Sequence, residues 1–220
     1  MIYAYGICEG LAATAVVGRR GLGGARLRAL ERAELAAVYS RHRSLRPRAT
    51  PQLLFAYESV LEAIMAHGAV LPLRFGTQFE REEQLGAVLV NRHDELLRSL
   101  ERVRGRAEFG IRLIPRRAPP RGRARGRTGS GYLLARVRDH RCYQEAIREV
   151  DAALAALSVA SYIREPRRPP AILVASYLVD SARVMEFRQA ADQLARCQEA
   201  MKMLVTGPWP PYSFVAEEQR

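Results

Sequence analysis

The chain has 220 residues, of which 48% are apolar, so it is long enough to bury a core and too apolar for a disordered protein. Its longest apolar runs fall far short of the roughly 18–20 residues that span a membrane, which argues against a membrane-spanning protein. The net charge of +12 comes almost wholly from arginine, because Lys202 is the only lysine, and this skew indicates a coding bias as well as a basic surface.

Residues 1–105 predict an N-terminal α+β domain, with a mixed sheet and two helices on one face. β-rich runs predict its first strands at residues 2–7, 14–17, 25–30 and 35–40. Thr50 and Pro51 are typical of a helix N-cap and first helical position, and Gly68 is typical of the residue after a helix. We expect Glu58 to face outward from this helix, whose apolar stripe consists of Leu53, Leu54, Tyr57, Leu61, Ile64 and Met65.

The segment 70–75 predicts a further strand of this domain. Strand alternation would place Leu71, Leu73 and Phe75 on one face, and Val70, Pro72 and Arg74 on the other. A second helix is predicted over residues 82–103, with a capping box at residues 77–80 before it and Gly105 after it.

Residues 106–206 predict a ferredoxin-like C-terminal domain with the order β-α-β-β-α-β. The strands are expected at residues 109–114, 159–164, 172–179 and 201–205. The helices are expected at residues 132–157 and 181–199, the second capped by Ser181. Helices cover only one face of such a sheet, so the other face is expected to be solvated or to bury against something.

An arginine-rich segment interrupts this second domain. Residues 115–131 read PRRAPPRGRARGRTGSG, which holds six arginines and no acidic residue. Its Pro and Gly content and its lack of apolar periodicity predict a flexible loop. The loop is interpreted either as a solvated linker or as a grip on phosphate or on an acidic protein surface.

The C-terminal tail, residues 207–220, begins with GPWPPYSFV. Its prolines argue against a helix or a central strand, and Trp209, Tyr212 and Phe214 are large apolar anchors beside the rigid Pro211. Two hypotheses follow. The tail folds back over its own chain and bridges the two domains, or it docks in a groove of a partner.

The residues that carry enzyme or metal chemistry show no recognisable spacing. The sequence contains no HExxH, P-loop, GxGxxG or GxSxG pattern, and residues 21–24 are interpreted as a hairpin turn and not as a phosphate cradle. The three cysteines, Cys8, Cys142 and Cys197, are expected to be buried free thiols. The four histidines, His42, His67, His93 and His140, are expected at the surface or at helix ends. We therefore predict a protein that is not an enzyme and that uses no metal or cofactor.

Nucleic-acid binding through a basic surface is the alternative function for a ferredoxin-like domain. RNA-recognition domains place aromatic residues on their two central strands. The C-terminal domain offers Tyr177 but no aromatic cluster, and residues 74–77 match the pattern poorly. The sequence therefore argues against nucleic acid as a partner.

Several short motifs together resemble one protein family. These are YAYGI from Tyr3, LPLRFGT from Leu71, EFGIR from Glu108, SYLVD from Ser176 and the tail TGPWPPYSFV from Thr206. They resemble the hallmark segments of the GvpL/GvpF family of gas vesicle proteins, in the same order and over essentially the whole chain. Tyr57 departs from the pattern, because this position more often holds His in the family.

The resemblance implies an accessory or minor structural protein of gas vesicle formation. Family members are thought to contact the small hydrophobic shell protein of the vesicle, and other accessory proteins are further expected partners. The resemblance implies a cytoplasmic protein, and the absence of a visible signal peptide favours the same location. The candidate interface or interdomain residues are Arg74, Phe75, Gly76, Trp209, Pro211, Tyr212 and Phe214. Arg74 is interpreted either as an anchor of its turn or as a charge presented to a partner.

Overall fold

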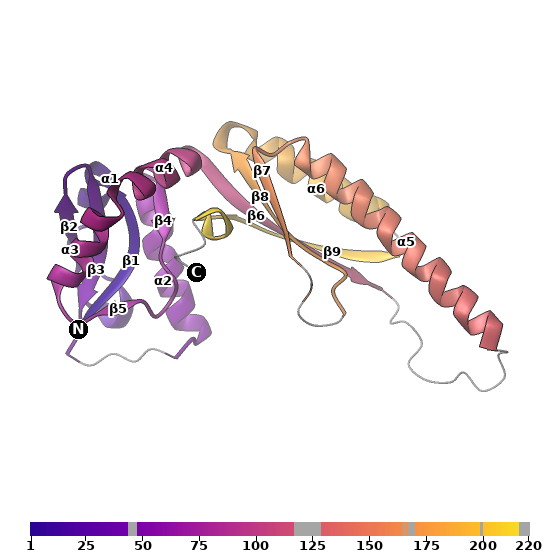
Figure 1. The fold of residues 1–220 in the computed structure, drawn as a ribbon, viewed down its shortest axis with the longest axis horizontal. Coiled ribbons are helices and arrows are strands. Elements are labelled where there is room, and N and C mark those ends of the chain that lie inside the picture. The colour runs from indigo at the N-terminus through magenta and orange to yellow at the C-terminus, as the bar shows by residue number, and fades with distance from the viewer. Residues whose placement is uncertain (44–47, 117–128, 165, 167–169, 199, 216–220) are drawn as a thin grey trace. The chain divides into compact units, whose positions relative to one another are not determined.

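The structure is a computed structural model that describes residues 1–43, 48–116, 129–164, 166, 170–198 and 200–215. The chain is an α+β protein that divides into two compact units (Figure 1). Unit 1 comprises Met1–Ala107 together with Trp209–Arg220, and unit 2 comprises Glu108–Pro208. Most of the predicted arginine-rich loop and the end of the tail lie outside the described residues.

The sheet of unit 1 is antiparallel in every strand pair described, and not mixed as predicted. Its strands follow the order β2-β3-β1-β4, with β5 paired to β1 beside β4. The strands are β1 (Ile2–Glu9), β2 (Leu27–Arg32), β3 (Leu35–Arg41), β4 (Val70–Pro72) and β5 (Gln78–Phe79).

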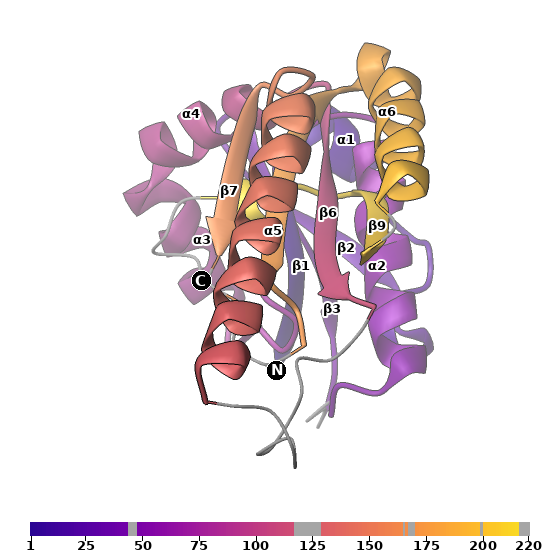
Figure 2. The same ribbon diagram turned by 90° about the vertical axis from the view of Figure 1, so that its right-hand side faces the viewer.

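Helices cover both faces of this sheet, which corrects the prediction of two helices on one face. Tyr3 and Tyr5 pack with α1 (Gly10–Thr14) and α2 (Pro51–Met65) in one core. Leu30 faces the opposite way, toward Gly86 of α3 (Glu82–Asn91). Figure 2 shows α3 and α4 (His93–Val103) on one side of the strands and α2 on the other. Burial from both sides explains why every residue of 2–8 is buried.

Three local predictions for unit 1 are wrong. Residues 14–17 form the end of α1 and a turn instead of a strand, because the chain reverses there toward the short 3₁₀ helix η1 (Leu22–Gly24). The predicted helix 82–103 breaks at Arg92, which has a non-helical φ of −116°. The N-cap residue of α3 is Arg81 and not Thr77. Gln84 Oε1, in the first turn of α3, accepts from the backbone nitrogen of Glu80 at 2.9 Å.

Unit 2 has the element order β-α-β-β-α-β and a sheet with the strand order β7-β8-β6-β9. The strands are β6 (Arg106–Pro115), β7 (Ala160–Arg164), β8 (Leu173–Asp180) and β9 (Met201–Trp209), and the helices are α5 (Gly129–Ala155) and α6 (Val184–Cys197). The 3₁₀ helix η2 (Ser181–Arg183) precedes α6, so Ser181 does not cap it. Pro208 lies in β9, which is an edge strand and tolerates the missing N–H, so this proline lies outside any helix or central strand, as predicted.

Both helices of unit 2 pack on the same face of its sheet. Phe109 of β6, Tyr177 of β8 and Phe187 of α6 form the centre of the core, with the rings of Phe109 and Phe187 4.8 Å apart. Figure 2 shows α5 and α6 together on one side of the four strands. The side chains that alternate with these core residues, such as Arg112, point away from both helices.

Candidate functional site

The turn after β4 holds three of the predicted site residues. Leu73 N donates to Tyr5 O at 2.9 Å and Ala4 N donates to Thr77 O at 3.1 Å, so both ends of the turn are tied to β1. Residues 74–76 project between these two attachments. Strand alternation does not extend through this segment, because β4 ends at Pro72.

Tyr57 of α2 holds this turn in place through its hydroxyl group and its ring. Its hydroxyl donates to Tyr5 O at 2.9 Å and also contacts Leu73 O. The Phe75 ring lies 5.4 Å from the Tyr57 ring and 6.0 Å from the Tyr3 ring, both at steep angles. Burial raises the pKa of Tyr57 far above its usual range, so the hydroxyl remains a proton donor. This network is structural, since its members satisfy one another.

Arg74 and Gly76 form the exposed tip of the turn. The Arg74 side chain makes no hydrogen bond or ion pair with any residue that the structure describes, whereas its backbone oxygen accepts from Thr77. Gly76 has a φ of +94°, which favours glycine, and its N–H donates to the Tyr3 hydroxyl at 2.6 Å. Because the backbone holds the turn, Arg74 is positioned to present its charge outward.

The C-terminal segment packs on unit 1. After β9 the chain forms the 3₁₀ helix η3 (Tyr212–Phe214), and Tyr212 packs against the core of unit 1. Its hydroxyl donates to Glu58 Oε1 of α2 at 2.8 Å. Pro211 is buried and Phe214 is only 5% exposed, whereas Trp209 is 38% exposed. These contacts favour the hypothesis in which the tail packs on its own chain.

Glu58 is a site residue that the sequence analysis placed wrongly. It is half-buried and not outward-facing, because Tyr212 covers it. Burial raises the pKa of its carboxyl group, and the hydrogen bond from Tyr212 partly opposes this shift. No local pattern distinguishes Glu58 from a solvated helix residue, since its partner lies 154 positions away.

Exposed apolar side chains lie beside Glu58 on α2. Leu54 and Phe55 precede it by four and three positions, so both are its neighbours on the helix surface. Phe55 is 76% exposed and Leu54 is 38% exposed. We call Leu54, Phe55, Glu58 and Tyr212 the α2 surface. It combines two exposed apolar side chains with the anchor of the tail.

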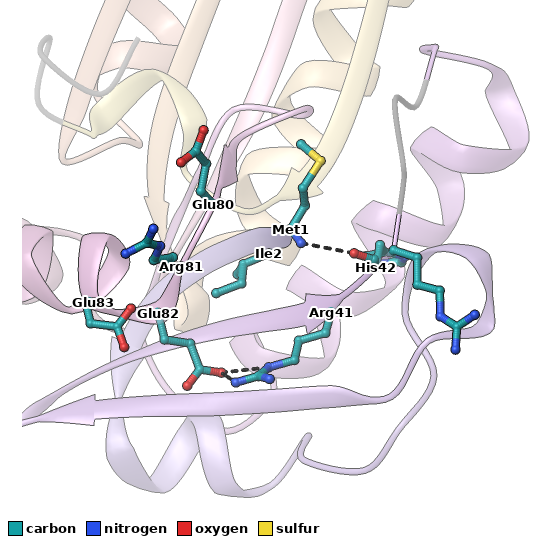
Figure 3. A pocket seen from close by; sticks show the side chains of 9 residues that line it. Met1, Ile2, Arg41, His42, Glu80, Arg81, Glu82 and Glu83 are labelled. Carbon is teal, nitrogen blue, oxygen red and sulfur yellow. Dashed lines mark hydrogen bonds and ion pairs between the residues drawn. The ribbon is translucent and has the colours of Figure 1, made fainter.

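A polar pocket of about 540 Å³ lies near the chain start (Figure 3). Its charges largely compensate one another. Arg41 Nη2 lies 2.6 Å from Glu82 Oε1, and the N-terminal amine donates to His42 O at 3.1 Å. The remaining lining consists of Ile2, Arg43, Glu80, Arg81 and Glu83. Since both signs of charge line it, the pocket favours no charged ligand of either sign.

A hydrogen-bond chain leads from His42 into the core. His42 Nε2 lies 2.8 Å from Ser40 Oγ, which lies 2.9 Å from the Tyr5 hydroxyl, and Leu22 N donates to that hydroxyl at 2.8 Å. Burial, and secondarily the N-terminal amine, lower the pKa of His42. In the neutral form Nε2 can accept from Ser40, so every donor in the chain has an acceptor.

The described residues contain no cluster of three or more His, Cys, Asp or Glu side chains that could hold a metal. Cys8 is buried, and burial raises its pKa to about 12, but Cys142 and Cys197 are exposed, so the prediction of buried thiols is wrong for these two. His93 begins α4 and contacts Glu34 and Asp94, which agrees with a helix-end role. Within the described part of the chain, no helix is both long and apolar enough to cross a membrane.

The glycine-rich turn at residues 21–24 does not form a phosphate cradle. Two of its N–H groups bond to the turn itself: Gly21 N donates to Ala25 O at 2.8 Å, and Gly24 N donates to Gly21 O at 3.1 Å. Leu22 N is engaged by Tyr5. A hairpin-like turn, as predicted, accounts for the glycines.

Comparison of the sequence with known families finds a match over residues 1–216 to the family described as "Gas vesicle synthesis protein GvpL/GvpF". Gas vesicle protein F2 of Halobacterium salinarum is 28% identical over 217 residues, which cover 97% of this chain and 91% of that protein. Gas vesicle protein L of a Streptomyces strain is 29% identical over 186 residues, covering 74% of this chain and 69% of that protein.

The fold is also similar to solved structures. The crystal structure of GvpF from Anabaena matches with a TM-score of 0.79 and 19% identity, over 98% of this chain and 95% of that one. GvpF from Microcystis aeruginosa matches with a TM-score of 0.78 and 17% identity, over 98% of both chains. At these identities the likeness establishes the fold alone.

Proposed function

Because the chain belongs to the GvpL/GvpF family of gas vesicle synthesis proteins, we propose that it is an accessory protein that binds the hydrophobic shell subunit during vesicle assembly. It acts in the cytoplasm and at the gas vesicle, alongside other accessory proteins, and performs no catalysis. A shell subunit exposes apolar surface before it is assembled, so a partner that covers this surface limits its aggregation.

The exposure of Phe55 is the observation that supports this proposal most directly. Its ring is 76% exposed on α2, next to Leu54, on the helix that also holds the tail through Tyr212. Burying one such aromatic side chain against an apolar partner contributes about 2 kcal/mol. Aromatic side chains of this kind are frequent centres of protein interfaces.

The exposed turn with Arg74 and Gly76 presents a positive charge on unit 1. The turn that carries them packs through Phe75 on Tyr57 of α2, so it is held rigidly next to that helix. A rigid exposed cation orients a partner more than it strengthens binding. We therefore propose that the α2 surface binds the shell subunit and that Arg74 fixes its orientation.

A double variant tests this assignment. Leu54→Ser with Phe55→Ser removes these two apolar side chains. Phe55 is 76% exposed, so its loss costs little stability, whereas Leu54 is 38% exposed and its loss costs more. The matched control is Leu11→Ser with Val90→Ser, which removes the exposed apolar residues of α1 and α3. Each double variant is co-expressed with tagged shell subunit, and co-purification measures binding. Vesicle formation is scored separately in cells that carry the variant in place of the natural protein.

We expect the α2 double variant to remain folded, as checked by circular dichroism, but to lose co-purification with the shell subunit and to form few vesicles. The control should retain both properties. Normal shell binding and normal vesicles with the α2 double variant would show that shell recognition uses another surface.

A further inference from the structure

The sheet of unit 2 has one face that neither of the two α-helices described in that unit, α5 and α6, covers. The core of unit 2 uses Ile111, Ala175 and Met203, so the residues that alternate with them point to the opposite side. In β7 the pairing of Arg164 with Val174 places both on this opposite side. We use the name open face for one half of this side, the half at the ends of β6 and β7 and the starts of β8 and β9. It consists of Arg112, Ile114, Arg164, Val174, Lys202 and Leu204.

The cations of the open face alternate with aliphatic residues across the strands. Thr206 Oγ1 donates to Gly110 O at 3.3 Å, and Arg116 N donates to Ala200 O at 3.0 Å. This antiparallel register sets Arg112 opposite Leu204 and Ile114 opposite Lys202. Together with the pair of Arg164 and Val174, each cation has an aliphatic cross-strand neighbour.

The side chains of this surface are suited to a mixed contact. Arg112, Arg164 and Lys202 are exposed, whereas Ile114 and Leu204 are half-buried. Long cationic side chains lie along apolar neighbours and carry their charges to the rim. At these strand positions the described residues include no carboxylate, so the open face is cationic as well as apolar.

A helix fits this surface better than other occupants. Four strands span about 14 Å, which accommodates a helix about 10 Å in diameter. The opposite face of the same sheet already packs two helices, α5 and α6. An apolar stripe on the occupant would contact Ile114, Val174 and Leu204, and carboxylates beside that stripe would meet the three cations.

Single-stranded nucleic acid fits less well. Base stacking uses aromatic rings on the central strands, but at the open face the central strands β6 and β8 carry Arg112, Ile114 and Val174. Tyr162 lies on the edge strand β7 and not on a central strand, and the Arg164 guanidinium covers its ring at 5.1 Å from the centroid.

We propose that the open face docks an amphipathic helix of a partner protein that carries carboxylates beside its apolar stripe. This contact is separate from the α2 surface, which lies in unit 1. Charge complementarity between the cationic rim and the acidic helix selects the partner, and the aliphatic residues between the cations supply the buried area.

Three fluorescein-labelled synthetic helices of about 18 residues test the proposal. All share one leucine stripe, and the residues beside it are Glu, Gln or Lys. Binding to the full-length protein is measured by fluorescence anisotropy. We expect the Glu helix to bind about tenfold more tightly than the Gln helix, and the Lys helix to bind most weakly.

Charge reversal locates the contact. Arg112→Glu with Lys202→Glu should weaken binding of the Glu helix about tenfold and strengthen binding of the Lys helix. Arg148→Glu with Arg188→Glu, at exposed positions of α5 and α6, changes the net charge equally and should have no effect. Circular dichroism verifies that both double variants are folded.

Three results would overturn the proposal. The first is that none of the helices binds, and the second is that the control variant weakens binding as much as the open-face variant. The third is that a single-stranded oligo-dT binds the open face more tightly than the Glu helix and loses affinity with Arg112→Glu and Lys202→Glu, which would identify a nucleic-acid surface instead.

Discussion

Replacing Phe214 with alanine tests whether the C-terminal segment is part of the folded core of unit 1. Phe214 is 5% exposed within a short 3₁₀ helix. Phe→Ala changes in cores cost about 3–5 kcal/mol, and a terminal segment can relax, so we expect a loss of about 3 kcal/mol. For a chain of this length, that corresponds to a melting temperature lowered by roughly 6–12 °C.

Phe55→Ala is the matched control, because it removes the same side chain from a position that is 76% exposed. Its effect should stay within about 0.5 kcal/mol. Urea unfolding followed by circular dichroism measures both variants. Trp209, the only tryptophan, reports the segment separately. Its emission should shift to the red in Phe214→Ala because the chain beside it is released.

The reasoning fails if Phe214→Ala and Phe55→Ala have equal stabilities, or if Trp209 emission is unchanged in Phe214→Ala. Either result would mean that the segment does not pack on unit 1 in the free protein. The hypothesis in which the tail docks in a partner groove would then regain its support.

Three further predictions concern hydrogen bonds, protonation and backbone strain. Tyr212→Phe leaves the half-buried carboxylate of Glu58 without its hydrogen-bond donor and should lower the free energy of unfolding by about 1.5–3 kcal/mol near neutral pH. The loss should be smaller near pH 4, where the carboxyl group is protonated because its pKa is raised. An equal loss at both pH values would argue against this hydrogen bond. The pKa of His42 is lowered in the folded protein, so its contribution to stability should be present above its unfolded pKa of about 6.5 and be lost as pH falls toward the folded pKa. His42→Gln should therefore flatten the pH dependence of the melting temperature, measured in thermal melts from pH 5 to about 8. Gly76→Ala meets no atom within 4 Å, so its cost of about 1–2 kcal/mol in urea unfolding should come from the positive φ alone, and a neutral result would refute the strain.

The sequence alone identified the family and the α+β class. The family match over residues 1–216 confirms the resemblance that the ordered motifs indicated. Thr50 and Pro51 correctly marked the start of α2, where the Thr50 hydroxyl accepts from Leu53 N at 3.4 Å. The predicted strand 172–179 became β8, Leu173–Asp180, because a long apolar run with alternating burial carries its own signal.

The sequence could not decide which faces of the unit 1 sheet are covered. The consecutive burial of residues 2–8 arises because β1 is an inner strand of a sheet whose two faces are covered by helices, α2 on one face and α3, some 80 positions further along the chain, on the other. A register shift between Ala4 and Gly6 further changes which side chains face α2, from Tyr3 and Tyr5 to Cys8. Neither effect leaves a local pattern, because each depends on distant elements.

The tail shows the same division between sequence and tertiary structure. Its prolines and aromatic residues predicted a stiff apolar segment that must be held by something, since composition determines stiffness and the tendency to bury. Only the tertiary structure decided that Tyr212 bonds Glu58, because a hydrogen bond between residues 154 positions apart depends on how the whole of unit 1 folds. The same packing turned a helix residue expected to face water into the half-buried anchor of the chain end.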